Sequence, residues 1–119
     1  MLRRGTAARL TVYLHADARW HHHSVSDEII RRAHEDGLGG ASRFEGFLGY
    51  GRHGILHSDI DPDISGNLVC AVEIVDPSEV RLRTFAAQIE EVLDHGLIIL
   101  EPSEIVAIFS ESAVQGTPA

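Results

Sequence analysis

Hydrophobic and polar residues alternate near the start of the chain, where Leu10, Val12 and Leu14 are separated by more polar side chains. Successive side chains of a strand point to opposite faces, so this period of two predicts a half-buried strand over about 8–16. A second strand is expected over about 41–48. We expect Phe44 and Phe47 on its buried side.

Between these two segments the apolar positions follow helical spacing, which predicts one amphipathic helix. Its apolar positions are Val25, Ile29, Ile30 and Ala33. Ser24 or Ser26 can cap the amino end, and Gly37 supplies the left-handed residue that ends many helices. The helix should therefore lie between these caps with one face on the core.

The second half of the chain repeats this order. Residues 68–75 are nearly all apolar, which is typical of a central strand buried on both faces. Asp76 as N-cap and Pro77 at the first helical position predict a helix that ends at Gly96. A last strand is expected over 98–100 and 105–109, bent at Pro102.

The two halves share one plan, because Leu10 precedes Gly37 by 27 positions and Val69 precedes Gly96 by 27. A βαββαβ order predicts an α+β, ferredoxin-like fold, with a four-stranded antiparallel sheet and both helices on one face. The other face would meet solvent or a partner. We expect a second subunit to cover it.

The domain boundaries follow from these patterns. We expect a flexible N-terminus over 1–7, a single domain over 8–110 and a disordered tail over 111–119. Glycines, Pro62 and three aspartates interrupt the pattern over 49–66, which predicts a long loop. A loop of this length in a small domain suggests a function.

Composition narrows the possible functions. With 119 residues the chain is one domain, and its net charge of −8 argues against a nucleic-acid surface. All ten cationic residues are arginines, so an anion site must use Arg, His or backbone N–H groups. The single Cys70 and the absence of a signal or membrane-spanning segment favour a cytoplasmic protein.

Two histidine-containing segments suggest a metal site. If the chain is extended at His21-His22-His23, His21 and His23 share one side and can chelate zinc, with His15 or Asp17 as a further ligand. His53 and His57 near three aspartates form another candidate set, although a calcium loop would need its glycine and glutamate elsewhere. The alternative is a solvated turn in the first case and a solvated acidic loop in the second.

Nothing in the sequence predicts catalysis. The Gly-x-Ser-x-Gly motif is absent, Cys70 lies within an apolar strand, and no carboxylate pair has a supporting base at a known motif spacing. We therefore expect a protein that is not an enzyme.

Several motifs together resemble the short PII-like family of unknown function, whose genes often lie beside fluoride-export channels. These segments, which extend the resemblance from about Ala8 to Phe109, are 9–14, 17–20, 37–41, 46–51 and 72–76. The resemblance implies a ferredoxin-like homotrimer related to the PII signalling proteins.

PII proteins hold nucleotides in clefts between subunits and contact channels, transporters or enzymes through a long loop after the second strand, the T-loop. Their second strand ends in a Gly-aromatic-Gly-Arg pattern that wraps phosphates. A similar pattern occurs here at Gly49-Tyr50-Gly51-Arg52, where glycines let backbone N–H groups approach an anion and Arg52 can neutralise it. The chain departs from the PII pattern at 94–97, where the second Gly-rich, Lys-containing phosphate loop is missing.

The resulting hypothesis is a regulatory homotrimer that senses a small anionic effector, with an adenine nucleotide as the candidate ligand. Its expected ligand-binding residues are Asp17, Arg19, Gly49, Tyr50, Gly51, Arg52 and His53. The long loop would then act on a membrane transporter, a channel or an enzyme. The alternatives are a zinc- or copper-binding trimer and a structural trimer without a ligand.

Overall fold

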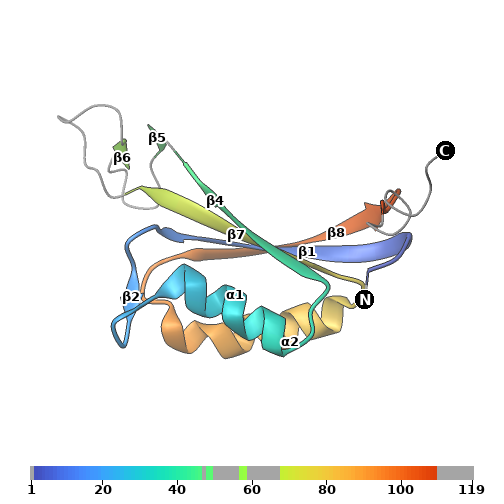
Figure 1. Cartoon of the computed structure of the whole chain (residues 1–119), viewed down its shortest axis with the longest axis horizontal. Helices are drawn as coiled ribbons and strands as arrows, with labels where there is room; N and C mark the ends of the chain where they lie inside the picture. Colours follow the sequence, from blue (N-terminus) through green and yellow to red (C-terminus); the bar gives the residue numbers. More distant parts are fainter. Residues whose placement is uncertain (1, 47, 50–56, 59–67, 110–119) are drawn as a thin grey trace, which may run out of the picture.

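Four strands form one antiparallel sheet in the order β4-β7-β1-β8, and two helices cover one of its faces (Figure 1). The structure is a computed structural model, and it describes residues 2–46, 48–49, 57–58 and 68–109. The sheet strands are β1 (Gly5–His15), β4 (Gly40–Glu45), β7 (Val69–Asp76) and β8 (Leu97–Ile105). The helices are α1 (Val25–Glu35) and α2 (Glu79–Ile89), the latter continued by the 3₁₀ helix η1 (Glu90–Val92).

Two short hairpins complete the described elements. One pairs β2 (Arg19–Trp20) with β3 (His23–Ser24), and the other pairs β5 (Leu48–Gly49) with β6 (His57–Ser58). The order of the long elements is the predicted βαββαβ, so the α+β, ferredoxin-like fold is confirmed. No helix within the described ranges is long and apolar enough to cross a bilayer.

The hydrophobic core lies between the sheet and the helices. Alternate positions of the two central strands face the helices and are buried, namely Ala8, Leu10, Val12, Leu14, Cys70, Val72, Ile74 and Asp76. Ile29 from α1 and Leu82, Phe85 and Ile89 from α2 close this layer. The alternation predicted for the first strand is therefore what fixes its orientation in the sheet.

Neither described helix lies against the opposite face of the sheet, here called the open face (Figure 1). Directly paired residues share a face, so the register places Phe44, Ala71, Tyr13 and Leu97 in one row across all four strands. Phe44 is 55% exposed and Leu97 is 57% exposed. The open face therefore presents an apolar row to its surroundings.

Two predictions about strand burial were wrong. Phe44 lies opposite Ala71 on the open face and is exposed, whereas we had placed it on the buried side of its strand. β7 is central, yet Val69, Ala71, Glu73 and Val75 are only partly buried because no helix of the described ranges covers the open face. Phe47 is outside the described residues.

Several element boundaries also differ from those predicted: the helical segment of α2 and η1 ends at Val92 rather than at Gly96, and β8 ends at Ile105 rather than at 109. β1 begins at Gly5, since residues 5–7 pair with 103–105 of β8. β8 continues through Pro102, because an edge strand tolerates a residue without a backbone N–H. Ser78 is the N-cap of α2, and its hydroxyl accepts a hydrogen bond from the Arg81 N–H at 3.1 Å.

Asp76 was predicted to be the N-cap of the second helix, but its side chain makes different contacts. Its side chain is fully buried and accepts hydrogen bonds from the Gly39 N–H (3.0 Å), the Ser78 N–H (2.9 Å) and the Arg81 guanidinium (3.1 Å). These three donors come from the connection before β4 and from the start of α2. The carboxylate therefore joins the two chain halves at one end of the sheet.

Candidate functional site

Several chain connections meet at the end of the sheet that bears the β2–β3 hairpin. The Ala16 N–H, just after β1, donates to the Leu68 carbonyl at 2.7 Å, and the Gly46 N–H donates to the Val69 carbonyl at 3.0 Å. Both attachment points of the segment between Gly46 and Leu68 are thus bonded to this end of the sheet. The bond between Ala16 and Leu68 therefore ties the end of β1 to the residue that follows the predicted long loop.

A cavity of about 190 Å³ lies at this end and is called here the strand-end cavity. Its walls come from the end of β1, the hairpin, the start of α1 and the connection from η1 to β8. The lining residues are His15, Asp17, Ala18, Arg19, Val25, Val92, Leu93, Asp94 and His95. The structure therefore brings the predicted residues Asp17 and Arg19 together around one cavity.

Asp94 and His95 were not predicted as site residues. They lie about eighty positions from Asp17 in the sequence and reach it only through the fold. The neighbouring Gly96 makes this approach possible, because a Cβ there would lie 2.7 Å from the Tyr13 carbonyl oxygen. The sequence signal was the glycine after the helix, which we interpreted only as a helix end.

The cavity combines three kinds of polar group. Arg19 can pair with an anionic oxygen, and the imidazoles of His15 and His95 can donate or accept hydrogen bonds. Asp17 and Asp94 accept hydrogen bonds and favour a ligand that also carries hydroxyl or amino groups. Val25, Val92 and Leu93 form an apolar wall.

The hairpin beside the cavity has an unusual turn. His21 and His22 both have positive φ, at 49° and 66°, between the paired residues Trp20 and His23. Two positive φ angles in a two-residue loop define a type I′ turn. The extended geometry assumed for His21 and His23 is therefore wrong, because His21 belongs to the turn.

The other predicted site residues are not brought to the strand-end cavity by anything the structure describes. Gly49 ends β5 and pairs with His57, while Tyr50, Gly51, Arg52 and His53 lie outside the described residues. Within those parts of the chain that are described, no group of three or more His, Cys, Asp or Glu side chains can hold a metal. Zinc binding by His21 and His23 stays a prediction.

A buried carboxylate organises the helix next to the hairpin. Glu28 is 7% exposed and accepts hydrogen bonds from Arg31 (2.7 and 3.0 Å) and from Arg32 Nε (2.7 Å). These bonds, first those from Arg31, lower the pKa of Glu28 from 4.5 to about 2. Glu28 is therefore an anion that fixes two guanidinium groups.

Arg32, one of the two arginines held by Glu28, also contacts η1 and the hairpin. Its Nη1 donates to Glu91 of η1 at 2.7 Å, and its guanidinium lies 5.1 Å from the centre of the Trp20 ring. Trp20 also contacts His21 edge-on, with ring centres 4.4 Å apart. A cation over an indole ring is attractive, so Arg32 ties α1, η1 and the hairpin together beside the cavity.

Cys70 has no features of a nucleophile. Its side chain is 1% exposed in the core, and burial raises the pKa of the thiol. A thiolate at this position is disfavoured.

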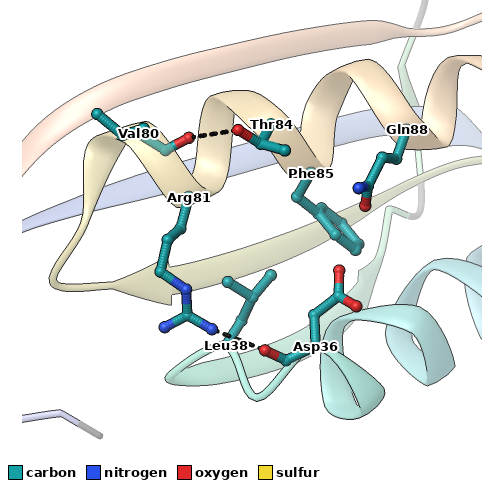
Figure 2. Close-up of a pocket in the computed structure, with 7 residues that line it drawn as sticks. All are labelled: Asp36, Leu38, Val80, Arg81, Thr84, Phe85 and Gln88. Atoms are coloured by element: carbon teal, nitrogen blue, oxygen red, sulfur yellow. Dashed lines mark hydrogen bonds between the residues drawn. The ribbon is translucent and has the colours of Figure 1, made fainter.

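A second cavity, also of about 190 Å³, lies between the end of α1 and α2 and is called here the interhelix cavity (Figure 2). Its lining residues are Asp36, Leu38, Val80, Arg81, Thr84, Phe85 and Gln88. No motif in the sequence identified it, because its members come from the connection after α1 and from α2, which are far apart in the sequence.

Comparison with known proteins places the chain in a family. The family model DUF190, described as "Uncharacterized ACR, COG1993", matches residues 7–105. The chain is also similar to the UPF0166 protein MJ1524 of Methanocaldococcus jannaschii, with 30% identity over 91 residues, or 76% of this chain and 83% of that protein.

Proposed function

The chain thus belongs to the DUF190 family, and we propose that it is a PII-like regulatory protein that binds a small anionic metabolite between subunits. An adenine nucleotide is the candidate ligand. In this proposal the segment 49–66 passes the binding signal to a transporter, a channel or an enzyme. The observation that carries the proposal is the placement of Arg19 in the strand-end cavity, whose lining residues His15 and Asp17 flank Ala16, the residue bonded to Leu68 at the end of that segment.

The polar groups of the cavity support a nucleotide over a simple anion. Arg19 matches a phosphate group, while Asp17 and Asp94 would repel an anion that offers no hydrogen-bond donors. Ribose hydroxyls and an adenine amino group supply such donors. The combination therefore favours a ligand with one anionic part and one donor-rich part.

The size of the cavity supports a shared site. Ligand pockets typically enclose roughly 300–1,000 Å³, whereas the strand-end cavity has about 190 Å³. One subunit on its own would enclose part of a nucleotide. Arg52, a neighbouring subunit or both would have to complete the site.

Homotrimer formation is the second part of the proposal. The apolar row on the open face, with Tyr13 40% exposed at its centre, is the surface that a further subunit would cover. Obligate homo-oligomers bury apolar surface of this kind. The proposed trimer gives each cavity a neighbour that can contribute to the ligand site.

The test is titration calorimetry with AMP, ADP and ATP on the full chain and on two arginine variants. Arg19→Ala should weaken binding by about tenfold or more, because it removes a charge-assisted hydrogen bond. Arg83→Ala is the matched control, since Arg83 lies on α2 and pairs with Glu79 outside the cavity. No binding of any of the three nucleotides to the unaltered chain, or equal loss in both variants, would contradict the proposal.

The signalling part is tested separately by hydrogen exchange. A bound nucleotide should protect the amides of residues 49–66, and Arg52→Ala should remove this protection. Protection that is unchanged in Arg52→Ala would contradict a role for this arginine in ordering the segment. Native mass spectrometry of the same samples reports whether the protein is a trimer that retains up to three ligands.

A further inference from the structure

The interhelix cavity has an apolar base and a polar rim (Figure 2). Phe85 of α2 and Leu38, after α1, form the base, while Gln88 and Asp36 extend toward each other across the opening. Val80 stands at the rim and is 72% exposed. The cavity can therefore hold an aliphatic chain with a polar group at its end.

The charges around this cavity do not cancel. Arg81 donates to the fully buried Asp76 at 3.1 Å and to the Asp36 backbone carbonyl at 2.7 Å, so its positive charge is balanced by the Asp76 carboxylate. Among the described residues, nothing bonds to the Asp36 carboxylate, which is directed into the cavity (Figure 2). A carboxylate without an ion-pair partner among the described residues thus faces the apolar base.

We propose that the interhelix cavity docks a lysine or arginine side chain from a basic segment of a protein partner. The aliphatic stem lies on Phe85 and Leu38, the cationic head pairs with Asp36, and the Gln88 amide oxygen accepts a second hydrogen bond. An apolar neighbour of the basic residue covers Val80.

Long-range electrostatics supports a basic partner. The chain carries a net charge of −8, which attracts a positively charged segment and speeds its association. The exposed Val80, on the far side of the cavity from the Asp36 carboxylate (Figure 2), favours a peptide over a free polyamine, which has no apolar side chain to cover it. This proposal is independent of nucleotide binding, because it uses no residue of the strand-end cavity.

The experiment is an amide NMR titration with the peptide acetyl-Leu-Arg-amide. Its matched probe is acetyl-Leu-citrulline-amide, which has nearly the same shape without the charge. The arginine peptide should shift the signals of Asp36, Leu38, Thr84 and Gln88. It should bind about threefold to fivefold more tightly than the citrulline peptide, the range expected for a partly exposed ion pair.

Three variants locate the charge. Asp36→Asn should reduce the affinity for the arginine peptide to that for the citrulline peptide, while Asp27→Asn, at the other end of α1, should leave it unchanged. Gln88→Glu adds a second carboxylate to the cavity and should tighten arginine-peptide binding about threefold. The spectra themselves confirm that each variant is folded.

Four outcomes of the peptide titrations would overturn the proposal. They are an absence of shifts at these residues, equal affinity for the two peptides, unchanged arginine-peptide binding in Asp36→Asn, and weaker binding in Gln88→Glu. Spermidine is the final probe. Shifts at the same residues with an affinity equal to that of the arginine peptide would show a general amine site and would contradict a peptide-docking site.

Discussion

Gly39 and Gly40 are adjacent in the connection between α1 and β4, but they have different neighbours. A Cβ on Gly39 would lie 2.3 Å from Leu2 Cδ2 and 2.7 Å from the Val75 carbonyl oxygen, whereas one on Gly40 would meet only Leu2 Cδ1 at 3.7 Å. The backbone oxygen of a central strand cannot move away cheaply. We therefore expect Gly39→Ala to destabilise the fold by about 1–3 kcal/mol.

Gly40→Ala is the matched control for this prediction. Its Cβ makes an ordinary contact and its φ is not positive, so it should change the free energy of unfolding by less than about 0.5 kcal/mol or stabilise slightly. Urea unfolding of both variants measures the difference. Equal midpoints for the two variants would show that the close approach at Gly39 carries no energetic weight.

Glu28 gives a pH-dependent prediction. Its pKa is lowered from 4.5 to about 2 in the folded protein, so the folded state holds the ionised form more strongly than the unfolded state does. The stabilisation is complete above about pH 4.5 and is lost as the pH falls toward 2. At pH 7, Glu28→Gln should cost about 1–3 kcal/mol, since two guanidinium groups lose an ionised acceptor.

Unfolding measured at intervals between pH 7 and pH 2 tests this sign. The stability difference between the unaltered chain and Glu28→Gln should shrink below about pH 4.5. Glu35→Gln is the control, because Glu35 is exposed and pairs only with Arg31 in the described part of the chain. A difference that grows on acidification would contradict the assigned pKa direction.

Single residues were predicted from the sequence where their conformation is local. Gly37 has the expected positive φ of 70°, and Ser24 caps α1 by accepting from the Asp27 N–H. Asp94 and Asp36 could not be found in this way, because their positions in cavities depend on contacts between segments far apart in the chain.

The turn of the β2–β3 hairpin has residues that do not favour its backbone conformation. Type I′ turns favour Asn and Gly, yet His21 and His22 occupy both positive-φ positions. A left-handed residue with a side chain costs about 1–2 kcal/mol relative to glycine. We expect His22→Gly to raise the melting temperature relative to His22→Ala, since alanine removes the imidazole but keeps the strained φ.

Calorimetry of both His22 variants makes the comparison, and His21 and His23 stay in place throughout. A melting temperature that is the same in the two variants would indicate that the turn opens in solution. A zinc titration of the unaltered chain and of a variant with His21→Ala plus His23→Ala tests the histidine hypothesis separately. Zinc binding that is unchanged in this variant would show that these two side chains are not zinc ligands.

Elements were predicted well where the apolar period was clear and less well where it was not. The alternation of 10, 12 and 14 and the helical spacing of 25, 29 and 33 each fixed an element and its buried face. For Phe44 the pattern was too short, and a large apolar residue was assigned to the core although its register places it on the open face. Pro102 was interpreted as a bend because the sequence does not say which strand is at the edge.

At the scale of the whole molecule, the two cavities lie at opposite ends of the helical layer. The strand-end cavity adjoins the start of α1, and the interhelix cavity adjoins its end. Both are separate from the apolar row on the open face. A basic peptide at the interhelix cavity can therefore be tested without blocking either the proposed ligand site or the open face.

The open face gives the prediction for assembly. Leu97 is 57% exposed at the β8 end of the apolar row, and a charge there would have to be desolvated if another subunit covers the row. We expect Leu97→Arg to convert the protein to monomers, whereas Ala87→Arg, on the exposed surface of α2, should leave its assembly unchanged. Sedimentation of the unaltered chain and both variants measures their assembly.

The sedimentation of the unaltered chain decides first whether the open face is covered. If this chain sediments as a monomer, the open face is solvated, and a ligand site shared between subunits is ruled out, while the proposal for the interhelix cavity is unaffected. If Leu97→Arg assembles as the unaltered chain does, the subunits meet through another surface, because a buried unpaired arginine in each subunit would oppose assembly through this row.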